Sequence, residues 1–336
     1  MVSGAMNLPP KDAIRVAPEP MRQFAGAVLQ KAGLGEEDAG LLARLLVLND
    51  LRGVFSHGTR QLSAYVDHFQ AGRLNPRPTV RVASDQGTTF AVDGDGGLGY
   101  FPAWRAAQLL VERCREHGIA AAITRNHGHI GAAGLYSRVP IEHGQIAYCT
   151  SGHELHLSAD QSILEAAGGS PMSFAVPAGD EPPLVLDFGA MHDLYPGSPH
   201  VQELIRMAPS TVFRSLGLGA VCQAVGGFLT GVPFGEGDGA RREESRRWEG
   251  ANQGAFMVAV EISRFLPPEK FIAQMQAYIG RVREMKPIEG YEPATLAGGL
   301  EWAREREWAE SGIPVGERHR AVLVRVGEAL GVPAPV

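Results

Sequence analysis

The stretch Gly94-Asp95-Gly96-Gly97-Leu98-Gly99 decides the fold class of this 336-residue chain. It lies between a predicted strand, 88–92, and a predicted helix, 102–117, and so matches the Gly-x-Gly-x-x-Gly fingerprint of a dinucleotide-binding βαβ unit. That fingerprint needs a second strand with an acidic end about 20 residues further on. The next predicted strand, 119–124, instead arrives later and runs into Arg125-Asn126-His127. We therefore interpret the glycines as a tight Asp-Gly turn and expect a fold other than the Rossmann fold.

Apolar residues recur with helical or strand periodicity on both sides of this stretch. The periodicity predicts helices at 19–32, 36–51, 61–71, 102–117, 132–143, 214–231 and 268–284, and two more within 296–330, separated by Gly312-Ile313-Pro314. It predicts strands at 80–83, 88–92, 119–124, 145–150, 172–176, 183–188 and 254–262. Because helices occupy both ends and the middle mixes βαβ units with hairpins, we expect an α/β fold with a mixed sheet. Residues 1–85 and 290–336 are expected to form a helical domain, into which a central domain, 86–289, is inserted.

The composition is that of a soluble globular protein, with 44% hydrophobic and 20% charged residues. The net charge of −6 argues against partners such as nucleic acid or an anionic membrane, because both require a basic surface. The longest apolar stretches, such as 216–229, contain several glycines and are expected to be too short to span a membrane, and residues 1–11 lack the apolar segment of a secretory signal. The widely separated Cys114, Cys149 and Cys222 indicate buried thiols and a cytoplasmic protein.

Ser56-His57-Gly58 is the first candidate for chemistry. It follows a strongly apolar helical segment, 39–47, and lies in a glycine-containing turn that also holds Arg52 and Arg60. Histidine exchanges protons near neutral pH, and a guanidinium binds a carboxylate through two parallel hydrogen bonds. The turn therefore suits proton transfer to a bound acid; the alternative is a histidine that only caps the end of a helix.

The second candidate is the stretch Arg125-Asn126-His127-Gly128-His129, continued by Ile130-Gly131-Ala132-Ala133-Gly134. It ends a strand and opens a helix with small residues, which allow a ligand to approach the N–H groups of the first turn. Two histidines beside such a site suit acid–base chemistry on a carboxylate-bearing substrate. The alternative is that the small residues only permit close packing of the helix.

A metal site is another interpretation of the same region. His127, His129, His153 and His156 are close in sequence, but His153-Glu154-Leu155-His156 lacks the i,i+4 spacing of the zinc proteases. No cysteine pair accompanies these histidines. We therefore expect no bound metal.

The two candidate stretches together resemble the type-2 malate/L-lactate dehydrogenase family, whose members use NAD or NADP and are unrelated to the Rossmann-type lactate dehydrogenases. The resemblance covers roughly residues 20–330, in the blocks Asp50–Gly58, Ala71–Pro76, Val92–Gly99, Asn126–Gly134, Val185–Asp187 and Gly312–Pro314. It implies a cofactor domain with a mostly antiparallel sheet, inserted in a helical, α+β domain that binds the substrate and forms a homodimer. It also implies hydride transfer between the nicotinamide and a small 2-oxo or 2-hydroxy carboxylic acid, or a cyclic imino acid.

The resemblance also assigns roles to individual residues. His57 and His129 match histidines to which proton transfer is assigned, and Ser56 and Asp187 match groups that orient the first of them. The residues expected to contact the cofactor are Thr150, Ser151, Phe188, Gly189 and Arg214. The candidates for binding the substrate are Arg52, Arg60 and Asn126.

Departures from the family pattern occur on both sides of the expected site. Phe55 and Gln61 stand where the family has an aspartate and an arginine, and Arg214 stands where it has a lysine. Arginine keeps the charge of lysine but not its shape. Two other functions therefore stay open. One is a family member that has lost redox chemistry and uses its histidines for a lyase or isomerase step; the other is a non-enzymatic binding or scaffold protein.

Overall fold

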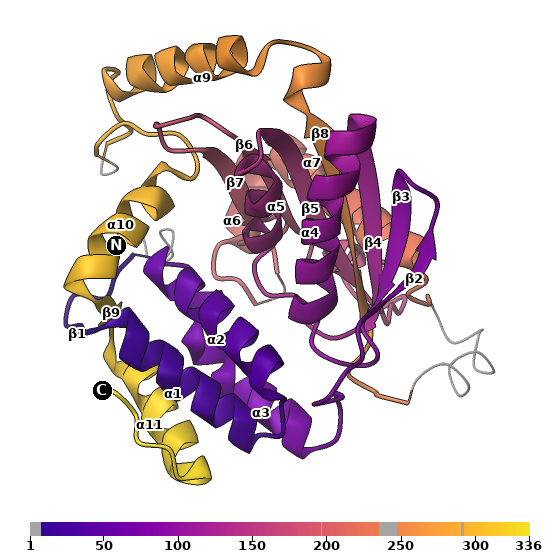
Figure 1. Cartoon of the computed structure of the whole chain (residues 1–336), viewed down its shortest axis with the longest axis vertical. Helices are drawn as coiled ribbons and strands as arrows, with labels where there is room; N and C mark the ends of the chain where they lie inside the picture. Colours follow the sequence, from indigo (N-terminus) through magenta and orange to yellow (C-terminus); the bar gives the residue numbers. More distant parts are fainter. Residues whose placement is uncertain (1–7, 196, 235–246, 290–291) are drawn as a thin grey trace. The chain divides into compact units, whose positions relative to one another are not determined.

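A computed structural model describes residues 8–195, 197–234, 247–289 and 292–336 (Figure 1). The chain divides into two compact units: unit 1 is Met1–Arg77 with Met285–Val336, and unit 2 is Pro78–Glu284. These boundaries precede the ones expected from the sequence, after residues 85 and 289. At the first boundary the reason is that β2 (Arg81–Asp85) pairs with β3 (Thr89–Asp93), and so it belongs to the sheet of unit 2.

Unit 1 is built from helices whose apolar sides pack together. Pro18 begins α1 at a position where its missing N–H costs nothing, and acidic residues in the first turn of α2 complement the helix dipole. The helices are α1 (Pro18–Lys31), α2 (Glu36–Leu51), α3 (Leu62–Gln70), α10 (Gly299–Ser311) and α11 (Glu317–Leu330). Their shared core includes Met21, Phe24, Leu29, Leu42, Leu46, Tyr65 and Leu323.

A short pair of antiparallel strands also belongs to unit 1. β1 (Ile14–Val16) pairs with β9 (Ile313–Val315), with Ile14 opposite Val315. Neither strand is predictable from periodicity, because three residues are too few to show an alternating period. The pair joins segments near the two ends of the chain, which explains how both termini contribute to one unit.

Unit 2 is centred on a seven-stranded sheet in the order β2-β3-β4-β8-β5-β6-β7. Neighbouring strands are antiparallel except β3 and β4, which are parallel. The remaining strands are β4 (Ile119–His127), β5 (Gln145–His153), β6 (Pro171–Val176), β7 (Leu184–Gly189) and β8 (Gln253–Glu261). This order confirms the expected mixed and mostly antiparallel sheet, which differs from the parallel sheet of a Rossmann fold.

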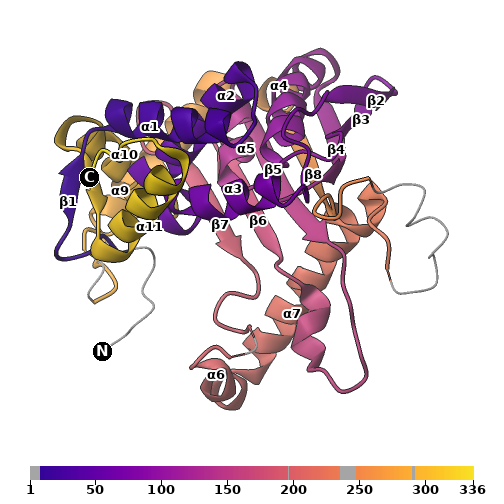
Figure 2. The same ribbon diagram turned by 90° about the horizontal axis from the view of Figure 1, so that it is seen from below.

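Helices cover both faces of this sheet. Figures 1 and 2 show α4 (Tyr100–His117) and α5 (Gly134–Ile141) on one face and α7 (Pro209–Gly226) on the other. α7 begins earlier than the predicted 214, and α6 (Val201–Met207), which precedes it, is not predicted. α6 is only seven residues long, so its apolar residues, such as Val201, Leu204 and Ile205, are too few to show a sustained helical period. A further helix, α9 (Pro268–Arg283), follows β8.

Glycines let α7 approach the sheet closely. A Cβ at Gly226 would lie 2.5 Å from the carbonyl carbon of Ser151 on β5, and one at Gly219 would lie 2.6 Å from the Cβ of Ala167. Both positions therefore exclude any larger residue unless the backbone moves. This confirms the expectation that the glycines of this helix mark close packing.

α7 is also the segment that comes nearest to a membrane-spanning helix. Pro209–Thr230 is long and apolar enough by length and composition, and one third of its most apolar window (33%) is buried. The expectation that the apolar stretches are too short is therefore wrong for this segment, because α7 and the 3₁₀ turn that follows it, Phe228–Thr230, together extend beyond both ends of 216–229. Length and composition are weak support for a membrane span, since a helix that packs against a soluble core passes the same test.

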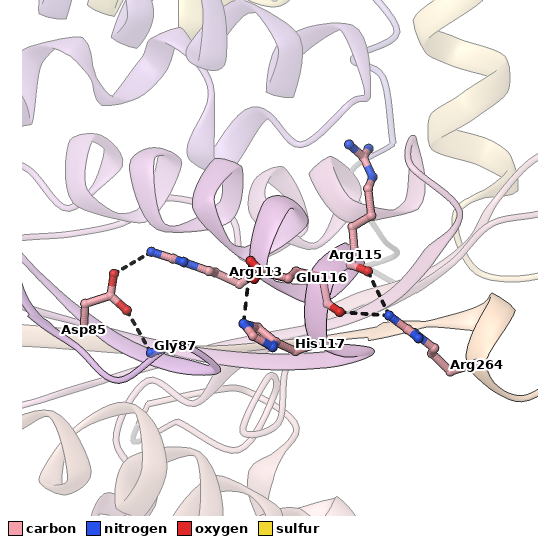
Figure 3. Close-up of polar contacts among 7 residues, drawn as sticks. All are labelled: Asp85, Gly87, Arg113, Arg115, Glu116, His117 and Arg264. Atoms are coloured by element: carbon pink, nitrogen blue, oxygen red, sulfur yellow. Dashed lines mark hydrogen bonds and ion pairs between the residues drawn. The ribbon is translucent and has the colours of Figure 1, made fainter.

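The edge of the sheet is tied to the end of α4 by charged side chains (Figure 3). Arg113 of α4 forms a 2.5 Å ion pair with Asp85 at the β2–β3 turn. At the end of the same helix Gly118 adopts φ +89°, and Arg264 donates to the carbonyl oxygen of Glu116 at 2.8 Å. A cation that binds the last carbonyls of a helix stabilises its C-terminus. These contacts hold α4 on its face of the sheet.

Gly219→Ala and Gly217→Ala form a matched pair within α7. Alanine stabilises a helix interior by about 1 kcal/mol relative to glycine, and a Cβ at residue 217 meets no atom within 4 Å. At residue 219 the added Cβ crowds Ala167, so overpacking is expected to cost about 1–3 kcal/mol. Urea denaturation should show the Gly217 variant stabilised and the Gly219 variant destabilised. Equal effects in both variants would contradict the packing described for α7.

Candidate active site

The turn that carries His57 is held by side chains on either side of it. α2 ends at Leu51, and two single-turn 3₁₀ helices, Phe55–His57 and Thr59–Gln61, follow. Asn49 Nδ2 donates to the carbonyl oxygen of His57 at 2.8 Å, and Gln61 Nε2 donates to that of Ser56 at 2.6 Å. The backbone of the turn is therefore fixed before any ligand binds.

Ser56 and His57 are brought together as the sequence predicts. Ser56 Oγ lies 2.9 Å from His57 Nδ1, within hydrogen-bonding distance. The imidazole is half-buried, and burial lowers the pKa of His57 below its ordinary value of 6.5. The neutral imidazole therefore predominates at pH 7, the form that accepts a proton.

Buried polar residues next to this turn, which local sequence does not reveal, also contact it. Asp50 is fully buried, and its Oδ2 accepts hydrogen bonds from the backbone N of Thr59 at 3.0 Å and from Thr59 Oγ1 at 2.6 Å. Thr59 Oγ1 is also 2.8 Å from His319 Nε2. The only signal in the sequence is an acidic residue in the mostly apolar last turns of α2, which does not tell whether the side chain points inward.

The structure distinguishes the two candidate arginines of unit 1. Arg52 is buried, and its Nε forms a 2.7 Å ion pair with Glu305 Oε2. Arg60 is exposed and lines a pocket of about 360 Å³ together with Lys11 and Arg318. Arg60 is therefore the arginine of this pair that is accessible to a ligand, whereas Arg52 already has an anionic partner.

The glycine stretch Gly94–Gly99 packs against the second candidate stretch, Arg125–Gly134. The backbone N–H groups of Gly94, Gly96 and Gly99 donate to the carbonyl oxygens of Arg125, Asn126 and His129 at 2.9, 2.9 and 3.0 Å, and the N–H of Gly128 donates to Gly97 O at 2.9 Å. The N–H groups that would cradle a phosphate in a dinucleotide fingerprint are thus used within the protein. We call this set of four hydrogen bonds the glycine clasp.

Asn126 takes part in the same arrangement. Its backbone has φ +55°, a conformation that asparagine adopts more readily than most residues. Its Nδ2 donates to Asp93 Oδ1 at 3.0 Å, and the backbone N of Asp95 donates to the same oxygen at 3.0 Å. The side chain predicted to bind the substrate therefore already holds the loop in place through one of its donors.

The two histidines of the second stretch have different environments. His127 is fully buried; its Nδ1 lies 2.7 Å from the carbonyl oxygen of Gly128 and its Nε2 lies 2.7 Å from Thr124 Oγ1. Since a carbonyl only accepts, Nδ1 carries the proton and Nε2 accepts from the threonine hydroxyl. Burial lowers the pKa of His127 to about 4, so the ring stays neutral. The inference that both histidines serve acid–base chemistry is wrong for His127, and only the half-buried His129 stays a candidate.

Asp187 lies at the beginning of α5. It is opposite Ser173 in the β6–β7 pair, and its carboxylate packs so closely on Gly134 that a Cβ there would overlap Oδ2. The first turn of a helix favours an anion because its N–H groups and dipole are positive. The small residues of this turn therefore accommodate a carboxylate of the protein itself.

The residues expected on the cofactor side fall into two groups. Thr150 and Ser151 are buried in β5, where Thr150 Oγ1 donates to Pro171 O at 2.7 Å and Ser151 lies under the end of α7. Phe188 and Arg214 are exposed, and Gly189 is partly exposed. The exposed group offers an aromatic ring and a cation to a ligand.

All three cysteines are buried and unpaired, as the sequence predicts. Within the described ranges, no group of three or more His, Cys, Asp or Glu side chains is placed to hold a metal ion.

The predicted site residues are divided between the two units. Unit 1 contributes Arg52, Ser56, His57 and Arg60. Unit 2 contributes Asn126, His129, Thr150, Ser151, Asp187, Phe188, Gly189 and Arg214. Of the predicted catalytic histidines, each unit therefore contributes one that is half-buried, His57 in unit 1 and His129 in unit 2.

The chain is similar to known dehydrogenases along nearly its whole length. The family model for malate/L-lactate dehydrogenase matches residues 16–191 and 199–323. A malate dehydrogenase of Pyrococcus horikoshii is 27% identical over 347 residues, which cover 95% of this chain and 96% of that protein. Hydroxycarboxylate dehydrogenase B of Escherichia coli O157:H7 is 23% identical, with 93% of each chain covered. The solved structure of malate dehydrogenase from Pyrococcus horikoshii has a TM-score of 0.77 and 25% identity, covering 97% of this chain and 98% of that one.

His127→Gln tests the structural role of this histidine. In the unfolded chain His127 takes up a proton near pH 6.5, whereas the folded protein resists protonation down to about pH 4. Its contribution to stability is therefore present above pH 6.5 and is lost as the pH falls toward 4, with a slope of about 1.4 kcal/mol per pH unit. Urea denaturation at several pH values should show this slope reduced in His127→Gln. The exposed His143→Gln is the control, and an unchanged slope in His127→Gln would contradict the assignment.

Proposed function

Because the chain belongs to the malate/L-lactate dehydrogenase family, we propose that it transfers a hydride between a nicotinamide cofactor and carbon 2 of a small carboxylic acid. The substrate carries a 2-oxo or 2-hydroxy group, or a cyclic imine in its place. The relatives named above are dehydrogenases. They support the redox reaction and not the lyase, isomerase or scaffold alternatives.

The pairing of Ser56 with His57 is the observation that carries this proposal. Reduction of a 2-oxo acid needs a hydride at carbon 2 and a proton at the oxygen, and oxidation needs the reverse. We assign the proton exchange to the imidazole of His57, which Ser56 Oγ contacts at Nδ1. The cofactor, when bound, supplies or accepts the hydride. His129 stays a prediction for proton transfer, and Asp187 stays a prediction for a group that orients His57.

We assign the substrate carboxylate to Arg60 in preference to Arg52. The guanidinium of Arg60 is exposed, while that of Arg52 is buried against Glu305. A guanidinium binds a carboxylate through two parallel hydrogen bonds, which orients the acid as well as attracting it. At position 61, where the family has an arginine, this chain has Gln61. Its amide already donates to the turn, so Gln61 is not a replacement for that arginine, and this supports the choice of Arg60.

For the cofactor we propose NAD or NADP, bound through unit 2. The exposed ring of Phe188 and the partly exposed Gly189 suit an aromatic base or nicotinamide, and the exposed cation of Arg214 suits a phosphate. Thr150 and Ser151 are buried, so we give them the role of fixing the strand end. The residues present therefore fit a nicotinamide dinucleotide without distinguishing NAD from NADP.

We further propose that the protein is a cytoplasmic homodimer whose contact includes the exposed side of α7. Large apolar side chains are exposed on α7 and its neighbours: Ile205, Met207, Phe213, Leu218, Val221, Phe228, Leu229 and Phe234. An exposed apolar surface of this kind is typical of a protein–protein contact. The surface belongs to unit 2, whereas the resemblance places dimerisation in the domain formed by the termini.

His57→Asn tests the proton-transfer assignment. Loss of the general acid–base group is expected to lower kcat about 10²- to 10⁴-fold, while binding of NADH or NADPH to unit 2 is unchanged in a fluorescence titration. Reduction needs the protonated imidazole, whose pKa lies below 6.5, so the wild-type rate of reduction falls as the pH rises through that pKa. The rate of oxidation rises over the same range. His143→Asn is the control; failure of the wild type to bind either cofactor at millimolar concentration would overturn the proposal.

Phe213→Glu combined with Val221→Glu tests the dimer contact. Charges placed on an apolar interface oppose association because they must be desolvated. Light scattering coupled to gel filtration should give the mass of a dimer for the wild type and that of a monomer for the double variant. Phe265→Glu, at a position 80% exposed outside this surface, should keep the dimer mass. A monomeric wild type would contradict the proposal.

A further inference from the structure

We propose that Asp50, Thr59 and His319 form a buried hydrogen-bonded chain that positions the imidazole of His57. In this proposal the three are positioning residues, because they act through the turn and not on the substrate. The inference rests on the proposed function of His57 in proton transfer.

The first link joins α2 to the turn. Asp50 belongs to the last turn of α2, and its Oδ2 accepts both the backbone N–H and the hydroxyl of Thr59, the second residue after His57. Gly58 packs against the same carboxylate so closely that a Cβ there would overlap Oδ1. The peptide that immediately follows His57 is therefore held against the side chain of Asp50.

The second link reaches α11, 260 residues further along the chain. Thr59 Oγ1 lies 2.8 Å from His319 Nε2, and its single proton is directed at Asp50. Thr59 must then accept a hydrogen bond from His319, which places the proton of this imidazole on Nε2. His319 also lies edge-on to Phe55, with ring centroids 6.4 Å apart, so both ends of the turn contact this one ring.

The charge states are compatible with this chain. Burial lowers the pKa of His319 to about 4, and the nearby charge of Arg60 acts in the same direction, so the ring is neutral. Burial raises the pKa of Asp50 to about 7, while its two hydrogen bonds from Thr59 and the charge of Arg60 oppose the rise. Arg60 is thus the charged group that influences both ends of the chain.

A buried carboxyl group is a costly way to hold a turn. Burying a polar group costs free energy unless hydrogen bonds compensate it, and Asp50 Oδ1 makes no hydrogen bond within the described part of the chain. An apolar side chain would stabilise the helix end without this cost. We therefore infer that the network serves the geometry of the turn, where a misplacement of about 1 Å can lower a rate roughly 10²-fold.

His57 depends on this geometry because its side chain follows its backbone. The carbonyl oxygen of His57 is bound by Asn49, and its ring contacts the hydroxyl of the preceding Ser56. With the Asp50–Thr59 contact, α2 holds the turn at His57 itself and two residues after it. Loss of the second contact should let the ring reorient and admit water.

Thr59→Val is the direct test, because valine keeps the shape of threonine and removes the hydroxyl. We expect two changes in the folded variant. In an NMR titration of ¹⁵N-labelled histidines, the pKa of His57 should rise toward its ordinary value as water reaches the ring. In steady-state assays kcat should fall roughly 10- to 100-fold, with the KM for the cofactor unchanged. Thr59→Ser, which restores the hydroxyl, should restore both values.

His319→Phe provides a second route if Thr59→Val does not fold. Phenylalanine keeps an aromatic ring beside Phe55 but lacks the Nε2–H donor, so the same two changes are expected. A folded Thr59→Val or His319→Phe with an unchanged His57 titration would overturn the proposal. The titration needs no substrate; a wild type without reductase activity would refute the proposed function, and the NMR result would still decide the positioning role.

Discussion

The glycine clasp is the constraint on which the arrangement of unit 2 depends. β3 and β4 are parallel neighbours, so the loops that follow them leave the sheet at the same edge, and the clasp joins these loops through backbone groups alone. It requires very close approach: a Cβ at Gly94 would lie 2.8 Å from the Cβ of His127, and one at Gly99 would lie 2.5 Å from Gly128 O. The buried side chain of His127 packs against Gly94 and Gly99 of the clasp. The four hydrogen bonds of the clasp fix where α4 and α5 begin, and with them the position of His129.

Each unit places a buried ionisable group directly beneath a turn that carries a candidate catalytic histidine. In unit 1 it is Asp50, whose pKa burial raises to about 7; in unit 2 it is His127, whose pKa burial lowers to about 4. Both shifts mean that the fold favours the uncharged form. The hydrogen bonds of each group go to backbone or hydroxyl groups nearby in the sequence: Asp50 binds Thr59, and His127 binds Thr124 and Gly128. Such buried networks cost stability but allow one geometry, which suits a site where orientation decides the rate.

Most of the fold could be predicted because long elements repeat their apolar period many times. The seven strands of the central sheet and the helices that cover it have this length, and the wrong spacing after the glycine stretch excluded a Rossmann fold. β1, β9 and α6 could not be predicted, since they are too short to repeat an apolar period. In the site, the Ser56–His57 contact is between adjacent residues and was predictable. The difference in burial between His127 and His129 was not predictable, because the two share the same local sequence.

By itself the sequence determined the fold class, the family resemblance and the residue types of the site, because these depend on periodicity and on motifs within one segment. The tertiary structure decided which of those residues is accessible. It buries Arg52 against Glu305, 253 residues away, and leaves Arg60 exposed. It also brings His319 to Thr59, a contact no local pattern encodes. The physical reason is that burial and hydrogen-bond partners are set by distant segments, and these determine whether a polar side chain holds the fold or meets a ligand.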